Sequence, residues 1–138
     1  MKFTGLHFFV RDMARTVAFY RRLGLRFSEG AEKDMFSSVA LEDGVHLAFG
    51  THALTRGYDP GFEEPSGASP NCLQFEVESR AATDRIYAEL TAAGHKGHLP
   101  PHDAFWGSRY AEVIDPDGNL VGFQSPVDPA KRSRPPGV

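Results

Sequence analysis

The sequence predicts an α+β fold built from two βαβββ modules in one chain, whose strands form a cup-shaped mixed β-sheet with helices on its outer face. The two halves of the 138-residue chain show the same order of apolar patterns: a strand, an amphipathic helix and three further strand-like segments. Each half closes its last hairpin on an Asp-Gly turn, and similar residues recur at fixed offsets, which indicates an internal duplication. The matched pairs are Val10/Val77, Ala14/Ala81, Tyr20/Tyr87 and Leu23/Leu90 at an offset of 67, and Gly44/Gly118, Leu47/Val121 and Phe49/Phe123 at an offset of 74.

The first module is expected over residues 1–50. Leu6, Phe8 and Val10 recur with period two, which predicts a half-buried strand over residues 3–10. Asp12 can cap a helix of about three turns that ends at Gly24. Three strand-like segments follow at residues 25–28, 35–41 and 45–50, with a hairpin turn at residues 43–44.

A connection is expected over residues 51–70, where the periodicity disappears and Gly, Pro and Ser accumulate. The second module, over 71–126, then repeats the pattern, with a helix capped by Ser79 and ended by Gly94. Its strands are expected at 72–77, 95–99, 108–114 and 120–124. Residues 127–138 hold too few apolar side chains to pack and are expected to form a flexible tail.

Composition excludes several classes of function. A net charge of −3 from 15 basic and 18 acidic residues lacks the basic excess of a nucleic-acid binder. No apolar run spans a bilayer and no signal peptide is evident, so we expect no membrane partner and a cytoplasmic location. The single cysteine, Cys72, agrees with a reducing compartment and excludes a Cys-rich zinc module.

Two amphipathic helices must cover one face of the sheet, and the apolar alternation assigns Leu6, Phe8, Phe49, Phe75 and Phe123 to that covered face. The opposite face is a polar and apolar mixture that suits a ligand cup, or else is the wet side of an antiparallel sheet. This face carries Gly5, His7, Phe9, His46, Ala48, Gly50, Cys72, Gln74, Glu76, Leu120, Gly122 and Gln124.

Four motifs together resemble the vicinal oxygen chelate superfamily, which includes glyoxalase I, extradiol dioxygenases and bleomycin-resistance proteins. They are residues 9–13 (FVRDM), 18–25 (AFYRRLGL), 106–111 (WGSRYA) and 115–119 (DPDGN). The resemblance covers about residues 3–126. It implies a cup formed within one chain or across two, and a homodimer as the assembly.

The same resemblance implies where metal ligands would lie, on the first and last strands of each module. In this chain those positions are Gly5, Ala48, Cys72 and Gly122, and three of them have no side-chain donor. A divalent metal needs three or four donors, so we expect no metal and no other cofactor. The alternative is a displaced metal site, for which the available side chains are His7, His46, Gln74, Glu76 and Gln124.

Aromatic side chains around the cup are candidates for ligand contact. Trp106 can stack on a planar ligand, or it packs structurally at the start of a strand. Phe36, Tyr58 and Phe62 can complete an aromatic wall, and Arg109 can meet an anionic ligand group or Glu112. The full candidate set is His7, Phe9, Phe36, His46, Ala48, Tyr58, Phe62, Cys72, Gln74, Glu76, Trp106, Arg109, Tyr110, Gly122 and Gln124.

The leading hypothesis is a metal-free protein that binds and sequesters an aromatic or heteroaromatic small molecule such as an antibiotic. No catalytic residue is assigned. One alternative is a metal-dependent lyase, isomerase or dioxygenase that uses the displaced metal site. Another is catalysis without metal, with His7 or His46 as general base.

Overall fold

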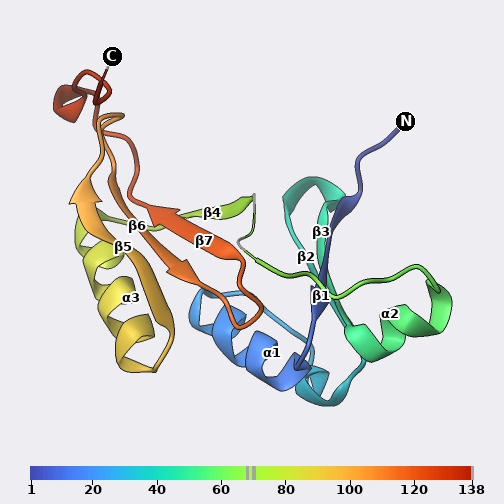
Figure 1. Ribbon diagram of the computed structural model, residues 1–138. Coiled ribbons are helices and arrows are strands. Elements are labelled where there is room, and N and C mark those ends of the chain that lie inside the picture. The colour runs from blue at the N-terminus through green and yellow to red at the C-terminus, as the bar shows by residue number, and fades with distance from the viewer. Residues whose placement is uncertain (68, 70, 138) are drawn as a thin grey trace. The chain divides into compact units, whose positions relative to one another are not determined.

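The computed structural model describes residues 1–67, 69 and 71–137, and the chain divides into two compact units, Met1–Ser66 and Gly67–Val138. The division falls inside the connection that the sequence predicts. Each unit has its own sheet and its own helices (Figure 1). In the described part of the chain, each helix is too short or too polar to cross a lipid bilayer.

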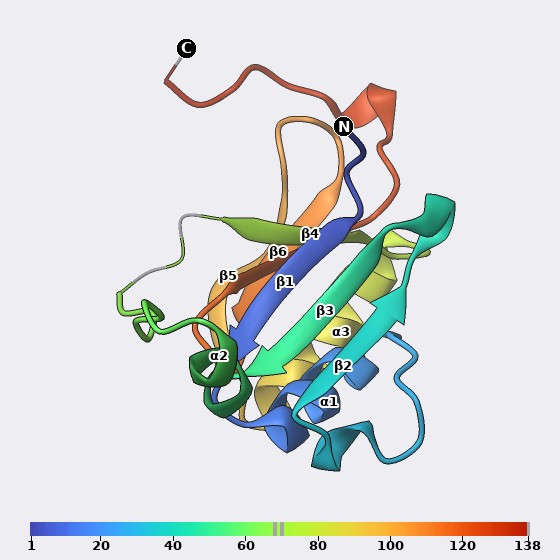
Figure 2. The ribbon, with the colours of Figure 1, turned by 90° about the vertical axis from the view of Figure 1, so that its right-hand side faces the viewer.

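The first unit holds a three-stranded sheet in the order β1-β3-β2, with β1 parallel to β3 and β2 antiparallel to it (Figure 2). Helix α1 packs against this sheet, where the Tyr20 ring lies 5.1 Å from that of Phe49. The elements are β1 (Gly5–Val10), α1 (Met13–Arg22), β2 (Phe36–Ala40), β3 (His46–Thr51) and α2 (His52–Tyr58), with short 3-10 turns at Ala31–Lys33 and Glu42–Gly44.

The second unit holds a four-stranded sheet in the order β4-β7-β6-β5, in which only β4 and β7 are parallel. Strand β5 passes through Pro100 and Pro101, which an edge strand with register shifts tolerates because the missing N–H groups interrupt no ladder. The elements are β4 (Cys72–Glu76), α3 (Arg80–Ala92), β5 (Lys96–Asp103), β6 (Arg109–Ile114) and β7 (Leu120–Gln124), with a 3-10 turn at Pro129–Lys131.

The α+β class and the mixed sheets are confirmed, and the strand register follows the predicted duplication. Gly5 pairs with His46 in the first sheet, and Cys72 pairs with Leu120 in the second. The offset of 67 relates Gly5 to Cys72, and the offset of 74 relates His46 to Leu120. The offset of 74 also relates β2 to β6, because Phe36 pairs with Gly50 and Tyr110 pairs with Gln124.

The helix starts are duplicated too. Asp12 accepts a hydrogen bond from the Arg15 N–H at 3.0 Å, and Ser79 accepts one from the Ala82 N–H at 3.1 Å. Both residues are N-caps with extended backbones, as the sequence predicts. The helices differ in length, 10 residues against 13. The difference in residue number between equivalent positions of α1 and α3 therefore changes along the helices. Leu90 corresponds to buried Tyr20 and not to Leu23.

The expected strand at residues 25–28 is absent from the structure. The Leu25 N–H bonds back to the Tyr20 carbonyl at the helix end, and the Arg21 guanidinium donates to the Ser28 carbonyl at 3.2 Å. These bonds occupy backbone groups that a strand would need, so the first sheet has three strands. Leu6 also differs from expectation, because it is 51% exposed and not part of the covered core.

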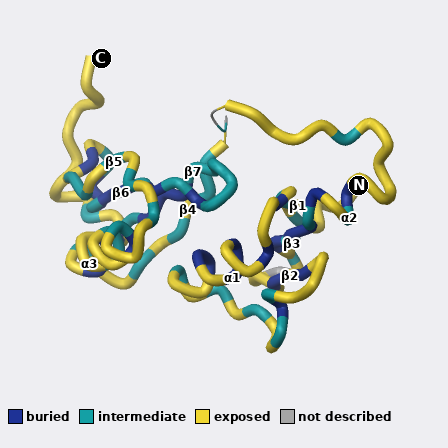
Figure 3. The backbone as a smooth tube through the Cα atoms, turned by 60° about the horizontal axis from the view of Figure 1, so that its bottom comes forward, coloured by how far each residue is buried: buried dark blue, intermediate teal, exposed yellow. Residues whose placement is uncertain are grey.

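The connection 51–70 is not all loop, because α2 forms its first third. Thr51 accepts a hydrogen bond from the Leu54 N–H at 3.2 Å, and the Thr55 hydroxyl donates to the Thr51 carbonyl at 3.0 Å. His52 and Thr55 are buried, so tertiary packing supports a helix that has no strong sequence periodicity. Beyond α2 the chain is mostly exposed up to residue 67 (Figure 3).

The C-terminal segment is hydrogen-bonded to the second unit as far as Ser133. The Asp128 N–H donates to the Gly107 carbonyl at 3.1 Å, and the Ser133 N–H donates to the Phe105 carbonyl at 2.9 Å. Gly107 has a positive φ of 100°, and a Cβ on it would lie 2.4 Å from the Asp128 oxygen. Backbone bonds, which need no apolar side chain, connect this segment to the turn before β6.

Candidate functional site

The first sheet has one face turned away from α1, and this open face is hollowed. Ser37 and Val39 of β2 are buried, whereas Phe36 and Ser38 are exposed on the open side. A pocket of about 320 Å³ lies there. It is lined by residues 4–7, Phe36 and Ser38 of β2, and His46 and Ala48 of β3.

The His7 imidazole forms one wall of this pocket. Its ring lies over Gly50, where a Cβ would be only 2.6 Å from His7 Nε2. The ring centroid is 4.9 Å from that of Phe9 and 5.8 Å from that of Phe36, which meets it edge to face. Burial lowers the pKa of His7 below its ordinary value of 6.5, so the imidazole is neutral at pH 7.

An aromatic row continues from His7 across the sheet toward α2. The Phe9 and Phe62 rings lie 5.3 Å apart, and the Phe62 and His52 rings also lie 5.3 Å apart. The Arg56 guanidinium lies 6.0 Å from the Phe62 ring centroid. The segment after α2 therefore places Phe62 beside Phe9 of β1, whereas Tyr58 at the end of α2 is 59% exposed, and neither Phe62 nor Tyr58 lines the pocket.

Ion pairs around Glu64 hold this segment in place. The Glu64 carboxylate pairs with Arg56, lies 3.5 Å from His52 Nδ1 and lies 3.8 Å from Arg11 Nε. Desolvation raises the pKa of Glu64, but the hydrogen bond from Arg56 and the nearby positive charge outweigh it and leave the pKa lowered. Glu64 is therefore ionised at neutral pH and available to these cations.

The open face of the second sheet is filled by Tyr110. This side chain is 5% exposed and its hydroxyl donates to Glu112 Oε1 at 2.8 Å. A Cβ on Gly122 would lie 2.5 Å from the Tyr110 hydroxyl, so the ring covers that glycine and leaves no room for a ligand on it. Glu112 also lies 3.7 Å from His98 Nε2.

Cys72 lies at the edge of the Tyr110 cluster. Its Sγ is 3.9 Å from the Tyr110 hydroxyl and donates to the Leu73 carbonyl at 3.4 Å. Burial raises the pKa of the Cys72 thiol, and burial together with Glu112 raises the pKa of Tyr110. Both groups keep their protons at neutral pH, so neither is an activated nucleophile or base.

Trp106 uses its polar edge within the second unit. The indole Nε1–H donates to Gln124 Oε1 at 3.0 Å, and the ring meets Tyr110 edge to face at 5.1 Å. These contacts favour structural packing of Trp106 over stacking on a planar ligand. Gln74 and Glu76, the other predicted polar residues on this face, are exposed on β4.

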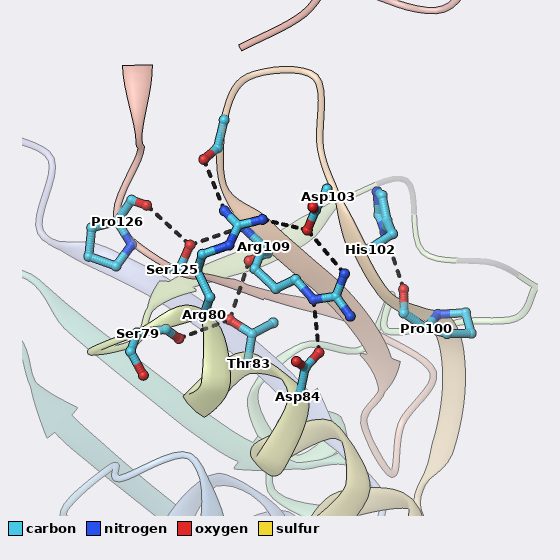
Figure 4. A network of polar contacts seen from close by, with 11 residues as sticks. Ser79, Arg80, Thr83, Asp84, Pro100, His102, Asp103, Arg109, Ser125 and Pro126 are labelled. Carbon is cyan, nitrogen blue, oxygen red and sulfur yellow. Dashed lines mark hydrogen bonds and ion pairs between the residues drawn. The ribbon is translucent and has the colours of Figure 1, made fainter. Parts of the chain in front are cut away.

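Arg109 belongs to a different network from the one the sequence predicts. Its side chain lies on the side of α3, where Nε donates to Asp84 at 2.9 Å and a terminal nitrogen donates to Asp103 at 3.1 Å (Figure 4). Arg80 of α3 pairs with the same Asp103. Arg109 therefore meets neither Glu112 nor the open face, and its role is to join α3 to the ends of β5 and β6.

The donor set does not fit a metal at the positions that the family resemblance implies. Gly5, Ala48 and Gly122 offer no side-chain donor, and the Tyr110 ring fills the space over Gly122. Among the described residues, no group of three His, Cys, Asp or Glu side chains could hold a metal ion. Of the displaced set, His7 and His46 share the pocket of the first unit, whereas Gln74, Glu76 and Gln124 belong to the second.

The candidate set from the sequence lacks Thr4, Gly5, Leu6 and Ser38 of the pocket lining and Glu112 of the second sheet. Ser38 lines the pocket, and its period-two relation to Phe36 along β2 was the available signal. Glu112, which binds the Tyr110 hydroxyl, lies two residues after it on the same face of β6 and carried the same signal.

Comparison with known proteins agrees with this architecture. A family model described as Glyoxalase/Bleomycin resistance protein/Dioxygenase superfamily matches residues 3–123. No curated protein sequence matches the chain.

Solved structures with similar folds include three crystal structures. A glyoxalase/bleomycin resistance protein/dioxygenase family enzyme from Burkholderia phytofirmans PsJN has a TM-score of 0.74 and 22% identity, covering 88% of this chain and 96% of its own. A glyoxalase/bleomycin resistance protein/dioxygenase from Nocardioides has a TM-score of 0.68 and 27% identity, covering 100% and 89%. A lactoylglutathione lyase from Agrobacterium tumefaciens has a TM-score of 0.63 and 17% identity, covering 91% and 93%. The chain belongs to the glyoxalase/bleomycin resistance protein/dioxygenase superfamily.

Proposed function

We propose that this protein binds an aromatic or heteroaromatic small molecule in the pocket of the first sheet and acts by sequestering it. The observation that carries the proposal is the pocket itself. Its volume of about 320 Å³ falls within the roughly 300–1,000 Å³ range of small-molecule sites, and aromatic, apolar and a few polar groups line it.

The chemistry of the lining supports binding more than catalysis. The polar side chains that line the pocket are the hydroxyls of Thr4 and Ser38 and the imidazoles of His7 and His46. Three of the four implied metal positions lack a side-chain donor and Cys72 stands alone, so these positions do not supply a ligand set for a Lewis-acid metal. An antibiotic is a natural ligand class to test, because the superfamily to which the chain belongs includes bleomycin-resistance proteins.

Ligand panels test the proposal. Purified protein is mixed with glycopeptide and quinone-type antibiotics and with simpler aromatic heterocycles, and thermal unfolding is measured. A ligand present at 100 times its Kd adds about 2.7 kcal/mol to the free energy of unfolding and raises Tm by several degrees. A panel that leaves Tm unchanged throughout removes the support for sequestration of such compounds.

Elemental analysis separates this proposal from a metal-dependent lyase, isomerase or dioxygenase. Protein purified without chelators is expected to carry far less than one Zn, Ni, Mn or Fe per chain. One tightly held metal per chain would establish the displaced site instead. Analytical ultracentrifugation of the same sample tests the homodimer that we also propose for this chain.

A further inference from the structure

The three strands of the first sheet, in the order β1-β3-β2, correspond to β4-β7-β6 of the second, but β3 and β7 carry glycine at different places. On the open face of β3 the sequence reads Ala48 and then Gly50, whereas the equivalent residues of β7 are Gly122 and Gln124. A glycine in a strand leaves room for a neighbouring side chain to lie flat on the backbone. The position of the glycine therefore decides which neighbouring ring covers the middle strand.

In the first unit the covering ring comes from β1. The His7 imidazole lies over Gly50, and the Cβ that any other residue would add there would be 2.6 Å from Nε2 and 3.3 Å from Cε1. These distances are shorter than van der Waals contact. The imidazole can keep its place only because residue 50 is glycine.

In the second unit the covering ring comes from β6. Tyr110 lies over Gly122 and is 5% exposed, while its counterpart Phe36 is 49% exposed. Phe36 pairs with Gly50, and its diagonal neighbour on β3 is Ala48, whose methyl group stands where Gly122 has only hydrogen in the other sheet. The space above Ala48 is consequently open, and the pocket lies in that space.

We infer that Gly50 is a positioning residue, because it lets the His7 imidazole lie beside the pocket. With the imidazole there, the space above Ala48 stays open for a planar, uncharged aromatic ligand. This inference rests on the proposed function. The residues that line the pocket include no carboxylate, ammonium or guanidinium group, so no permanently charged side chain is there to pair with a charged ligand. Phe36 and His7 present ring surfaces to a flat molecule, and Ser38 offers a hydrogen bond.

A double-mutant cycle tests the inference. The probes are quinoline, a planar uncharged heterocycle, and quinoline-2-carboxylate, its anionic relative. Gly50→Ala is expected to weaken quinoline binding about tenfold or more, because the displaced imidazole enters the pocket. In the His7→Ala background the same Gly50→Ala change is expected to alter the Kd less than about twofold.

Gly97→Ala is the matched control. Its new Cβ would lie 2.2 Å from the Tyr87 hydroxyl, so it also crowds an aromatic side chain, but one in the second unit that is not part of the pocket lining. It is expected to lower Tm and to leave the Kd for quinoline unchanged. Nitrogen-15 spectra of the histidine rings give a readout that does not depend on binding, with the His7 signals shifted by Gly50→Ala and not by Gly97→Ala.

The outcomes separate the two proposals. An unchanged Kd in Gly50→Ala, or an equal loss in the His7→Ala background, overturns the role of Gly50. Quinoline-2-carboxylate binding more tightly than quinoline overturns the uncharged ligand class. If the wild-type protein binds none of the aromatic probes, the proposed function fails. In that case unshifted His7 signals in Gly50→Ala would also reject the role of Gly50 in positioning the imidazole.

Discussion

His7 shows how a single residue is tuned by its neighbours. The sequence places it on the open face of β1, but its properties come from Gly50 beneath it and from the Phe9 and Phe36 rings beside it. These contacts shield part of the imidazole from water although the residue as a whole stays exposed, and partial loss of hydration disfavours the charged form. The same contacts make His7 a neutral wall of the pocket.

This burial makes stability depend on pH. The pKa of His7 in the folded protein is below 6.5, its ordinary value, so the unfolded chain binds a proton there that the folded chain does not. Stability should therefore fall as pH decreases from about 6.5 toward the folded pKa. Thermal unfolding between about pH 7.5 and 5 should show a smaller loss of Tm in His7→Gln than in the wild type. Parallel curves for the two proteins would contradict this linkage.

At the scale of elements, α1 and α3 begin in the same way, which reflects the internal duplication. Asp12 and Ser79 use different side-chain oxygens for the same bond, to the N–H three residues later. Each cap satisfies one of the N–H groups that a helix leaves without an internal partner. The caps are thus interchangeable in chemistry although the two residues differ in charge.

Substitution of the caps should show this interchangeability. Asp12→Ala and Ser79→Ala are each expected to lower the free energy of unfolding by about 1 kcal/mol, because the capping bond is lost. Asp12→Ser, which restores the oxygen found in the other half, is expected to cost much less. Denaturant titrations measure all three, and a similar loss for Asp12→Ser and Asp12→Ala would show that the charge of Asp12 matters more than its capping bond.

At the scale of the whole molecule, the chain consists of two units, each with a separate sheet. The segment that joins them has few backbone hydrogen bonds among its described residues, and residues 63–67 are exposed. Exposed backbone without such bonds is the preferred site of proteolysis.

Limited proteolysis should therefore cut first between the units. A low dose of subtilisin is expected to cut near residues 63–67 and give two fragments, which mass spectrometry would identify. The tail beyond Ser133 serves as an internal comparison, because it is also exposed. A first internal cut within β5 or α3 would contradict the division of the chain at this place.

The sequence by itself determined the duplicated order of elements, both long helices with their caps and both hairpins, because local patterns carry this information. Period-two alternation also placed His7, His46 and Ala48 on one open face, and the lack of donors at Gly5, Ala48 and Gly122 is visible in the sequence alone. The sequence did not predict α2, since that helix depends on burial of His52 and Thr55. It also did not predict that residues 25–28 form no strand.

Only the tertiary structure decided how the two open faces differ. Offsets of 67 and 74 make the faces look equivalent, yet Tyr110 fills one of them and a pocket remains on the other. The physical reason is steric, because a Cβ is present at Ala48 and absent at Gly122 and Gly50, and ring positions follow from that. Arg109 likewise binds Asp84 of α3, 25 residues earlier in the chain, where no local pattern indicates the contact.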